Sequence, residues 1–308
     1  MSKTVSKTAG NLALGDSSTH TKSATGIKST TRISPKRISP THIKAKPGTN
    51  GRLHRWLLHT PLLPLLTFAS IILLWELGTR LLNVPTYVLP APSRIVQGFN
   101  AIPATRWLEH IWSTLRVALI GFLASITVSL PIAIALAKSR LISRAVYPIL
   151  VVIQSVPVVA VAPIIIVVLG TDDAPRIVIT FMISFFPLVV SMTTGLMATP
   201  PELVELSRSL RASAWREVSQ IRLPYAIPYV FSGLKISITL AVIGAVVAEF
   251  VAAEKGLGYF IQFSTSMFKL PQAWAGLLVL ITLSLLLFQL VTLIQRVFFR
   301  WSLPLEPR

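Results

Sequence analysis

The chain contains no cysteine among its 308 residues. This absence excludes disulfides, thiolate metal sites and cysteine nucleophiles. Charged residues are also scarce, at 13% of the chain against about 25% in a soluble globular domain. Hydrophobic residues make up 53%. So little charge in a chain of this length excludes ordinary disorder, disfavours a single water-soluble domain and indicates a polytopic membrane protein.

Acidic residues are few. The chain contains 11 Asp and Glu against 29 Lys and Arg, which gives a formal net charge of +18. Residues 1–55 contain 11 of these cations and one acid, Asp16. Few large apolar side chains lie in this segment, so we expect a disordered basic cytosolic tail. The alternative is that a basic tail of this kind binds nucleic acid through its phosphates. We favour a role in orienting the membrane spans and touching anionic lipid, with no nucleic-acid partner.

Six apolar segments are long enough, or nearly so, to cross a bilayer core of about 30 Å as helices. Residues 56–308 are therefore expected to form an all-α domain of six transmembrane helices. Five prolines in or at the ends of these segments predict kinks: Pro131, Pro148, Pro157, Pro163 and Pro187. The expected spans are Pro61–Leu77, Val117–Ala137, Ala145–Leu169, Ile177–Ala198, Tyr229–Val251 and Ala273–Gln295.

The connections between the spans carry cations unevenly. Six spans place 21 Lys and Arg on one side and 6 on the other, with Arg116 and Lys235 assigned to helix ends. Cytosolic loops are enriched in Lys and Arg, so both termini are predicted to lie in the cytosol. A five- or seven-span chain would place one of the basic clusters on the opposite side.

The one long internal connection, residues 199–228, is predicted to lie on the cytosolic side. Two prolines followed by Glu202 are typical of a helix start. Leu203, Leu206 and Leu210 then share one face of this helix.

A second short helix is expected at residues 214–221, with Trp215, Val218 and Ile221 on one face and an end at Leu223-Pro224. We interpret the two helices as an amphipathic pair that offers apolar side chains to a partner. The alternative is an interfacial helix that only lies on lipid.

This connection resembles the cytosolic signature of ABC importer permeases, in which Glu precedes Gly-Ala-Ser by six residues and Leu-Pro follows about ten residues later. Here the pattern runs from Glu205 to Ser213 and ends at Leu223-Pro224. Two further matches are Ala248-Glu249 and Gly256-Leu257-Gly258. The resemblance covers about residues 60–300.

The segments 84–93 and 154–157 are similar to the subfamily for nitrate, sulfonate, taurine, bicarbonate and pyrimidine-precursor uptake. The chain departs from the family at Leu206-Ser207, where Ala-Ala is usual, and at Arg211, where glycine is usual. Glycine permits a sharp turn with positive φ, and arginine makes that turn costlier.

The resemblance implies a type I importer permease that forms the path for a small solute, either an anion or a pyrimidine-type precursor, in the bacterial cytoplasmic membrane. Implied partners are two ATP-binding subunits that hold ATP and Mg, a second permease copy, an extracytoplasmic solute-binding protein and membrane lipid. Glu249, Gly256 and Gly258 are candidates for a gate or an outer-face contact, although we favour a structural cap at a helix junction for Glu249. The implied contacts with the ATPase subunit are Glu205, Leu206, Ser207, Leu210, Arg211, Ala212, Ser213, Trp215, Leu223 and Pro224.

Enzymatic chemistry is not expected in this chain. It has no Gly-x-x-x-x-Gly-Lys-Ser/Thr loop for ATP, so ATP hydrolysis is expected on a separate subunit, and no cofactor is expected here. None of the five histidines forms an i,i+4 pair on a span, which disfavours a metal site. A secondary transporter would need ionisable residues and paired repeats in its spans, and a membrane-embedded enzyme would need clustered catalytic groups. Neither pattern is evident in the sequence.

Overall fold

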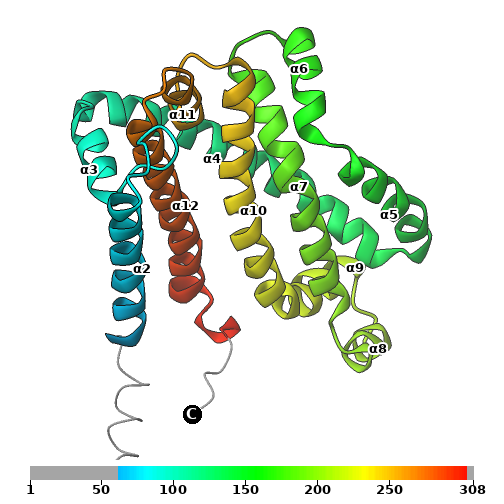
Figure 1. Cartoon of the computed structure of the whole chain (residues 1–308). Helices are drawn as coiled ribbons and strands as arrows, with labels where there is room; N and C mark the ends of the chain where they lie inside the picture. The colour runs from blue at the N-terminus through cyan, green and yellow to red at the C-terminus, as the bar shows by residue number, and fades with distance from the viewer. Residues whose placement is uncertain (1–61, 304–308) are drawn as a thin grey trace, which may run out of the picture. The chain divides into compact units, whose positions relative to one another are not determined.

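The computed structural model describes residues 62–303, which form helices joined by short connections (Figure 1). The basic tail expected at residues 1–55 lies outside this part of the chain, as do residues 304–308. The long helices are α2 (Leu62–Leu81), α4 (Ala104–Lys138), α7 (Asp173–Met197), α10 (Leu223–Ala252) and α12 (Leu270–Phe298). Shorter elements are α3 (Pro92–Asn100), α5 (Arg140–Ser155), α6 (Val158–Leu169), α8 (Pro201–Ser209), α9 (Ala214–Arg216), the π-helix η1 (Glu217–Arg222), α11 (Leu257–Ser266) and the 3-10 helix η2 (Arg300–Ser302).

Five helical segments are long and apolar enough to cross a bilayer, and the number rises to six if α5 and α6 count as one span. The upper number agrees with the six expected spans. Their bounds differ, because α4 begins at Ala104 and not near Val117. The fifth span is also longer than expected, since α9, η1 and α10 run together as one segment, Ala214–Ala252.

The third expected span, Ala145–Leu169, is not one helix. The axes of α5 and α6 meet at an angle of 89°. Val156, at the break, has φ −70° and ψ 123°, the extended shape favoured for a residue that precedes proline, here Pro157. Pro148 and Pro163, by contrast, lie inside helices that continue past them. The prediction of a kink in this span is therefore confirmed at Pro157, where the helix breaks.

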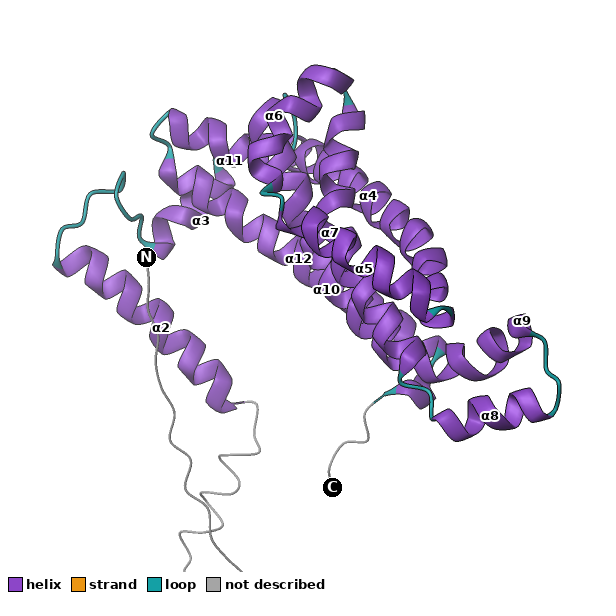
Figure 2. Cartoon of the chain, turned by 90° about the vertical axis from the view of Figure 1, so that its right-hand side faces the viewer, coloured by secondary structure: helices purple, strands orange, loops and turns teal. Residues whose placement is uncertain are grey.

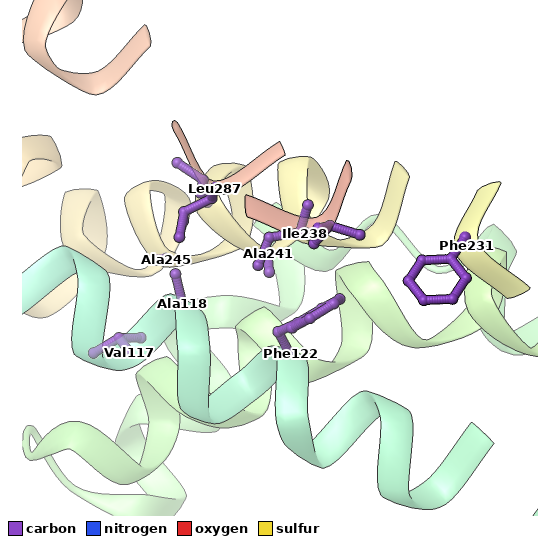
Figure 3. Close-up of a cluster of buried hydrophobic side chains, with 10 residues drawn as sticks. Val117, Ala118, Phe122, Phe231, Ile238, Ala241, Ala245 and Leu287 are labelled. Atoms are coloured by element: carbon purple, nitrogen blue, oxygen red, sulfur yellow. The ribbon is translucent and has the colours of Figure 1, made fainter. Parts of the chain in front are cut away.

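The core of the bundle lies where α7 packs along α4 and α10. Apolar side chains of α4 and α10 meet there, and α12 adds Leu287 and Val291 (Figure 3). Val117, Ala118 and Ala241 are fully buried in this cluster. Burial of these side chains fixes α10, the helix that continues from α9 and η1, within the bundle.

Small residues allow these helices to approach closely. A Cβ added at Gly244 would lie 2.8 Å from the backbone Cα atom of Thr180, so the α10 and α7 backbones touch at this point. Ser125 of α4 and Ser184 of α7 share a buried hydrogen bond of 2.7 Å. Glycine contacts and interhelical serine bonds are the means by which membrane helices associate.

One lysine lies within the fifth span. Lys235 of α10 donates a hydrogen bond of 2.7 Å to Oε1 of Gln295 on α12, and the Gln295 amide donates one of 3.1 Å to Ser302. Gln295 and Ser302 are buried. The ammonium group is thereby satisfied inside the protein, and the end of the described chain is held against α10.

Candidate functional site

Two groups of predicted site residues lie at opposite ends of the bundle. The first, in α8, α9 and η1, forms a hairpin that projects from one end, here named the α8 end (Figure 2). The second lies around α11 at the opposite end, here named the α11 end (Figure 1). The continuous helix Ala214–Ala252 joins the two ends.

The α8 end is shaped by two prolines and a helix terminus. Pro200 and Pro201 begin α8, since proline suits the first helical turn, where its missing N–H is not needed. Beyond the last turn, Arg211 has φ +53°. Its N–H donates to the carbonyl of Arg208 at 2.9 Å, and the N–H of Ala212 donates to that of Ser207 at 3.0 Å. These two bonds form a Schellman motif, which needs a residue of positive φ where this chain has arginine.

The second helix of the pair begins at Ser213, whose hydroxyl accepts a hydrogen bond of 3.3 Å from the N–H of Arg216. The helix does not end at Leu223-Pro224, which corrects the prediction. It passes through the π-helix η1 into α10, where Pro224 occupies the first turn. Proline is tolerated there because the regular α-helical hydrogen-bond pattern of α10 begins only at Leu223, after the π-helix. The α8 end is therefore joined to the core without a flexible link.

Large apolar side chains form an exposed ridge on this hairpin, composed of Leu206, Leu210 and Trp215. Their exposed fractions are 56%, 74% and 72%. The predicted faces are partly wrong, because Leu203 and Ile221 are half-buried and Val218 is buried. The sequence shows two apolar stripes on this pair without indicating which one packs inward.

The inner face of the hairpin is formed by Val204, Ser207 and Val218, all buried. Ser207 therefore supports α8 from inside, whereas Glu205 and Arg211 are exposed. Ala212 is half-buried within the turn, next to the exposed Ser213. Most of the residues predicted to contact a partner are exposed, whereas Ser207 is buried within the chain.

An ion-pair clamp holds the hairpin to the bundle. Glu217 of η1 contacts Arg222 at 2.7 Å and Arg208 of α8 at 3.6 Å. Arg222 also donates a hydrogen bond of 3.4 Å to the carbonyl of Leu196 in α7. Sequence reasoning missed Glu217, because the clamp joins residues of three elements, η1, α8 and α7, that are separated in the chain. The five-residue spacing of Glu217 and Arg222 is the only local sign.

At the α11 end, Glu249 lies at a junction of three helices and is 1% exposed. Its carboxylate accepts hydrogen bonds from the Thr114 hydroxyl of α4 at 2.8 Å and from the N–H of Gly258 at 2.7 Å. The Thr114 oxygen in turn accepts one of 2.8 Å from the N–H of Leu257. The carboxylate thus accepts one free N–H in the first turn of α11 directly, that of Gly258, and supports the acceptor of a second, Thr114, at a helix end where negative charge is favoured.

The two glycines of this junction make room for Glu249. Gly256 has φ +126°, and a Cβ at this position would lie 2.2 Å from the Glu249 carboxyl carbon. A Cβ at Gly258 would lie 2.9 Å from Oε2 of the same carboxylate. The N–H of Gly256 donates to Nδ1 of His110 at 3.2 Å, a contact that the sequence did not indicate. Glu249, Gly256 and Gly258 therefore form a single cluster.

Next to this junction lies a cavity of 800 Å³ with mixed charge, lined by residues from α4, α7 and the connection after α10. Asp173 forms ion pairs with Arg116 of α4 and with Arg176, the latter at 2.5 Å. Within residues 62–303, no three side chains of the types that bind metals gather as a metal site would require.

Comparison with known proteins gives a consistent result. The family described as binding-protein-dependent transport system inner membrane component matches residues 125–301. A probable ABC transporter permease protein of Haemophilus influenzae is 34% identical over 78% of this chain and 97% of its own. The formylaminopyrimidine transport permease protein ThiX of Halalkalibacterium halodurans is 31% identical over 77% and 95%.

Two further similarities add to this. The riboflavin transport system permease protein RibX of Chloroflexus aurantiacus is 31% identical over 77% of this chain and 88% of its own. Among solved structures, a chain of the MetNI methionine ABC transporter in an inward-facing conformation aligns with a TM-score of 0.55. That alignment covers 63% of this chain and 95% of the other, at 21% identity, and shows a shared fold.

Proposed function

The chain belongs to the family of binding-protein-dependent transport system inner membrane components and is a multi-pass permease subunit of an ABC importer, and from this premise we propose that its α8–α9 hairpin docks on an ATP-hydrolysing subunit. The resemblance found in the sequence is confirmed at the level of the family. The observation that carries the docking proposal is the exposed ridge of Leu206, Leu210 and Trp215. A projecting apolar ridge that contains tryptophan has the composition of a binding hot spot.

The residues of the hairpin have distinct roles in this proposal. The ridge enters a groove of the ATPase subunit, and Glu205 supplies a charge at its edge. Arg211, Ala212 and Ser213 form the tight turn that lets the partner approach the backbone. Ser207 packs beneath α8, and Leu223 and Pro224 carry the movement into α10.

Coupling follows from the continuity of Ala214–Ala252. A displacement of the hairpin moves α10, whose far end holds Glu249 and, through it, the first turn of α11. Glu249, Gly256 and Gly258 are therefore proposed to set the position of α11 at the outer mouth of the solute path. Closure of two ATPase subunits on ATP and Mg, which they and not this chain bind, would drive this displacement.

The proposed assembly is a two-fold dimer of this chain with two ATPase subunits, with its termini in the cytosol of a bacterium and a solute-binding protein at the α11 end. The transported solute is proposed to be a small pyrimidine-type heterocycle, because two of the relatives named above carry nitrogen heterocycles in their names. A sulfonate-like or nitrate-like anion is the alternative. Calorimetric titration of the cognate binding protein with both solute classes distinguishes them, and tight binding of the anion alone would refute the heterocycle.

We predict that Glu205→Lys or Ala212→Trp uncouples ATP hydrolysis from uptake or releases the ATPase subunit, while membrane insertion is unchanged. The first reverses a charge at the ridge, and the second places a bulky ring in the turn. Co-purification of the ATPase subunit and solute uptake in vesicles are the measurements. A loss of at least about tenfold in affinity is expected, since hot-spot substitutions cost about 2 kcal/mol or more.

Arg300→Glu is the matched control, because Arg300 is exposed, follows α12 and lies outside the hairpin. It should leave both measurements unchanged. Normal uptake by Glu205→Lys and Ala212→Trp, with the ATPase subunit still bound, would show that the interface is elsewhere.

A further inference from the structure

A cavity of 670 Å³ opens between α8 and the junction of α4 with α5, on the inner side of the hairpin. Its charge is strongly positive. Five cations line it against a single acid, Glu205: Lys138, Arg140, Arg144, Arg208 and Arg222. None of the three residues of the exposed ridge lines this cavity.

Three of these cations are free to take a ligand. Arg208 and Arg222 already contact Glu217. Lys138, Arg140 and Arg144 are exposed, and none of them forms an ion pair with any residue between 62 and 303. Arg140 and Arg144 lie in the first turns of α5, so the positive end of that helix adds to their field. The arrangement favours an anion with several acceptor oxygens, such as a phosphate.

The same cavity has an apolar edge. Leu136, buried at the end of α4, and Met197, 59% exposed at the end of α7, both line it. Leu141, which follows the cavity-lining Arg140 in α5, is 80% exposed. A free anion gains nothing from these side chains, whereas the acyl chain of a lipid covers them. Cations that stand beside an exposed apolar surface at helix ends therefore match an amphiphile.

We propose that this cavity binds the phosphodiester of an anionic phospholipid, and that the bound headgroup bridges α5 to α8. Arg140 and Arg144 hold the phosphate from α5. Arg208 approaches it from α8, since its contact with Glu217 is long, at 3.6 Å, and its side chain is 69% exposed. The acyl chains leave the cavity along Leu141 and Met197. A lipid held in this way restrains the hairpin against α5, so the anionic lipid content of the membrane sets how readily the hairpin moves.

Lipid titration of the purified full-length chain in an uncharged detergent tests this proposal. Bound lipid is counted by native mass spectrometry, with phosphatidylglycerol, phosphatidylcholine and inorganic phosphate as three separate probes. The wild-type chain should retain phosphatidylglycerol in preference to phosphatidylcholine. Arg140→Gln with Arg144→Gln should weaken phosphatidylglycerol binding by about 30-fold, since each such cation contributes about fivefold to the affinity for an acidic headgroup.

Arg296→Gln with Arg300→Gln is the matched control. These two arginines are also exposed, lie near the end of α12 and do not line the cavity. Binding should survive in this variant. Equal weakening of phosphatidylglycerol binding in both double variants would mean that only the net charge of the chain matters, and it would overturn the proposed site.

Two other outcomes also overturn the proposal. If inorganic phosphate binds the wild-type chain as tightly as phosphatidylglycerol does, the cavity is a site for a free anion. If Arg140→Gln with Arg144→Gln keeps its lipid but releases the ATPase subunit, the cavity is a protein contact. The lipid titration uses the permease chain alone, so its result does not depend on whether the exposed ridge docks on the ATPase subunit; release of that subunit is measured separately, by co-purification.

Discussion

Arg211 holds a backbone shape that an L-residue with a side chain adopts only at a cost. Two hydrogen bonds close the turn after α8, and they require the positive φ seen at this residue. Asn83 and Phe268 occupy the same position in the turns that follow α2 and α11. The left-handed shape costs a residue other than glycine about 1–2 kcal/mol, and three helices of this chain end in this way.

The first prediction at this scale is that Arg211→Gly strengthens the turn. Glycine removes the steric cost of the left-handed shape, and a gain of about 1 kcal/mol is expected after its greater freedom in the unfolded chain is subtracted. Hydrogen exchange at the Ala212 N–H, which bonds to Ser207, should slow about fivefold.

Arg216→Gly is the control for this measurement. Arg216 has φ −64° within a helix, so glycine there should weaken the hairpin by about 1 kcal/mol and speed exchange. If Arg211→Gly instead speeds exchange at Ala212, the guanidinium group stabilises the turn by a contact of its own, and the steric account is wrong.

Individual residues also mark the limit of the sequence as a guide. The family signature led directly to Glu205, Leu210 and Trp215, which are all exposed. It gave no sign of Glu217, since an ion-pair clamp between elements depends on how the chain folds back. The Glu249 junction was predictable in part: its distance along the helix placed it near one end, but Thr114 and His110 lie more than 130 residues away in the chain.

At the scale of helices, the close contact of α10 with α7 depends on Gly244. We predict that Gly244→Ala lowers the melting temperature of the purified chain in detergent. The added methyl group would lie 2.8 Å from a backbone atom of Thr180, so one of the two helices must shift. Overpacking of this kind costs about 1–3 kcal/mol.

Gly78→Ala is the matched control, because no atom lies within 4 Å of a Cβ added at this position in α2. The same substitution should there be neutral or stabilising, since alanine favours a helix more than glycine does. A melting temperature unchanged by Gly244→Ala would mean that α7 and α10 are less tightly packed than described.

Helix bounds were predicted unevenly, since α4 begins at Ala104, 13 residues before the expected start at Val117. The spans 177–198 and 229–251 correspond to α7 and to most of α10. Among the prolines, Pro157 breaks a helix, whereas Pro131, Pro148, Pro163 and Pro187 lie within helices. Proline identity is the same in all five cases, so packing around each one decides the outcome, and Leu223-Pro224 was misread for this reason.

For the whole molecule, the charge asymmetry predicts that the α8 end faces the cytosol. The chain lacks cysteine, so a single introduced thiol reports its own position. We predict that Thr171→Cys reacts with an impermeant thiol reagent in intact cells and that Ser209→Cys does not. Both residues are exposed, and they lie near the α11 end and in α8, respectively.

Permeabilised cells provide the control, since both cysteines should then react. Labelling of Ser209→Cys in intact cells would show that the orientation is the reverse of the one predicted, with the hairpin outside the cell, where no ATPase subunit could reach it.

The overall fold was the most predictable level, because apolar length and loop charge are properties of long segments. Contacts between those segments were the least predictable.

The unbroken segment Ala214–Ala252 contains 39 residues, about 58 Å along its helical path, and it turns aside between α10 and α9 (Figure 1). Such a segment has a rotational phase as well as a length, because each residue turns its successor by about 100°. The wide π turns of η1 set that phase, because a π segment accommodates an extra residue without breaking the helix. Deleting one residue from η1 would therefore turn α9, with Trp215, about α10 by roughly 100°, so the residue count of this short stretch sets the direction in which Trp215 points.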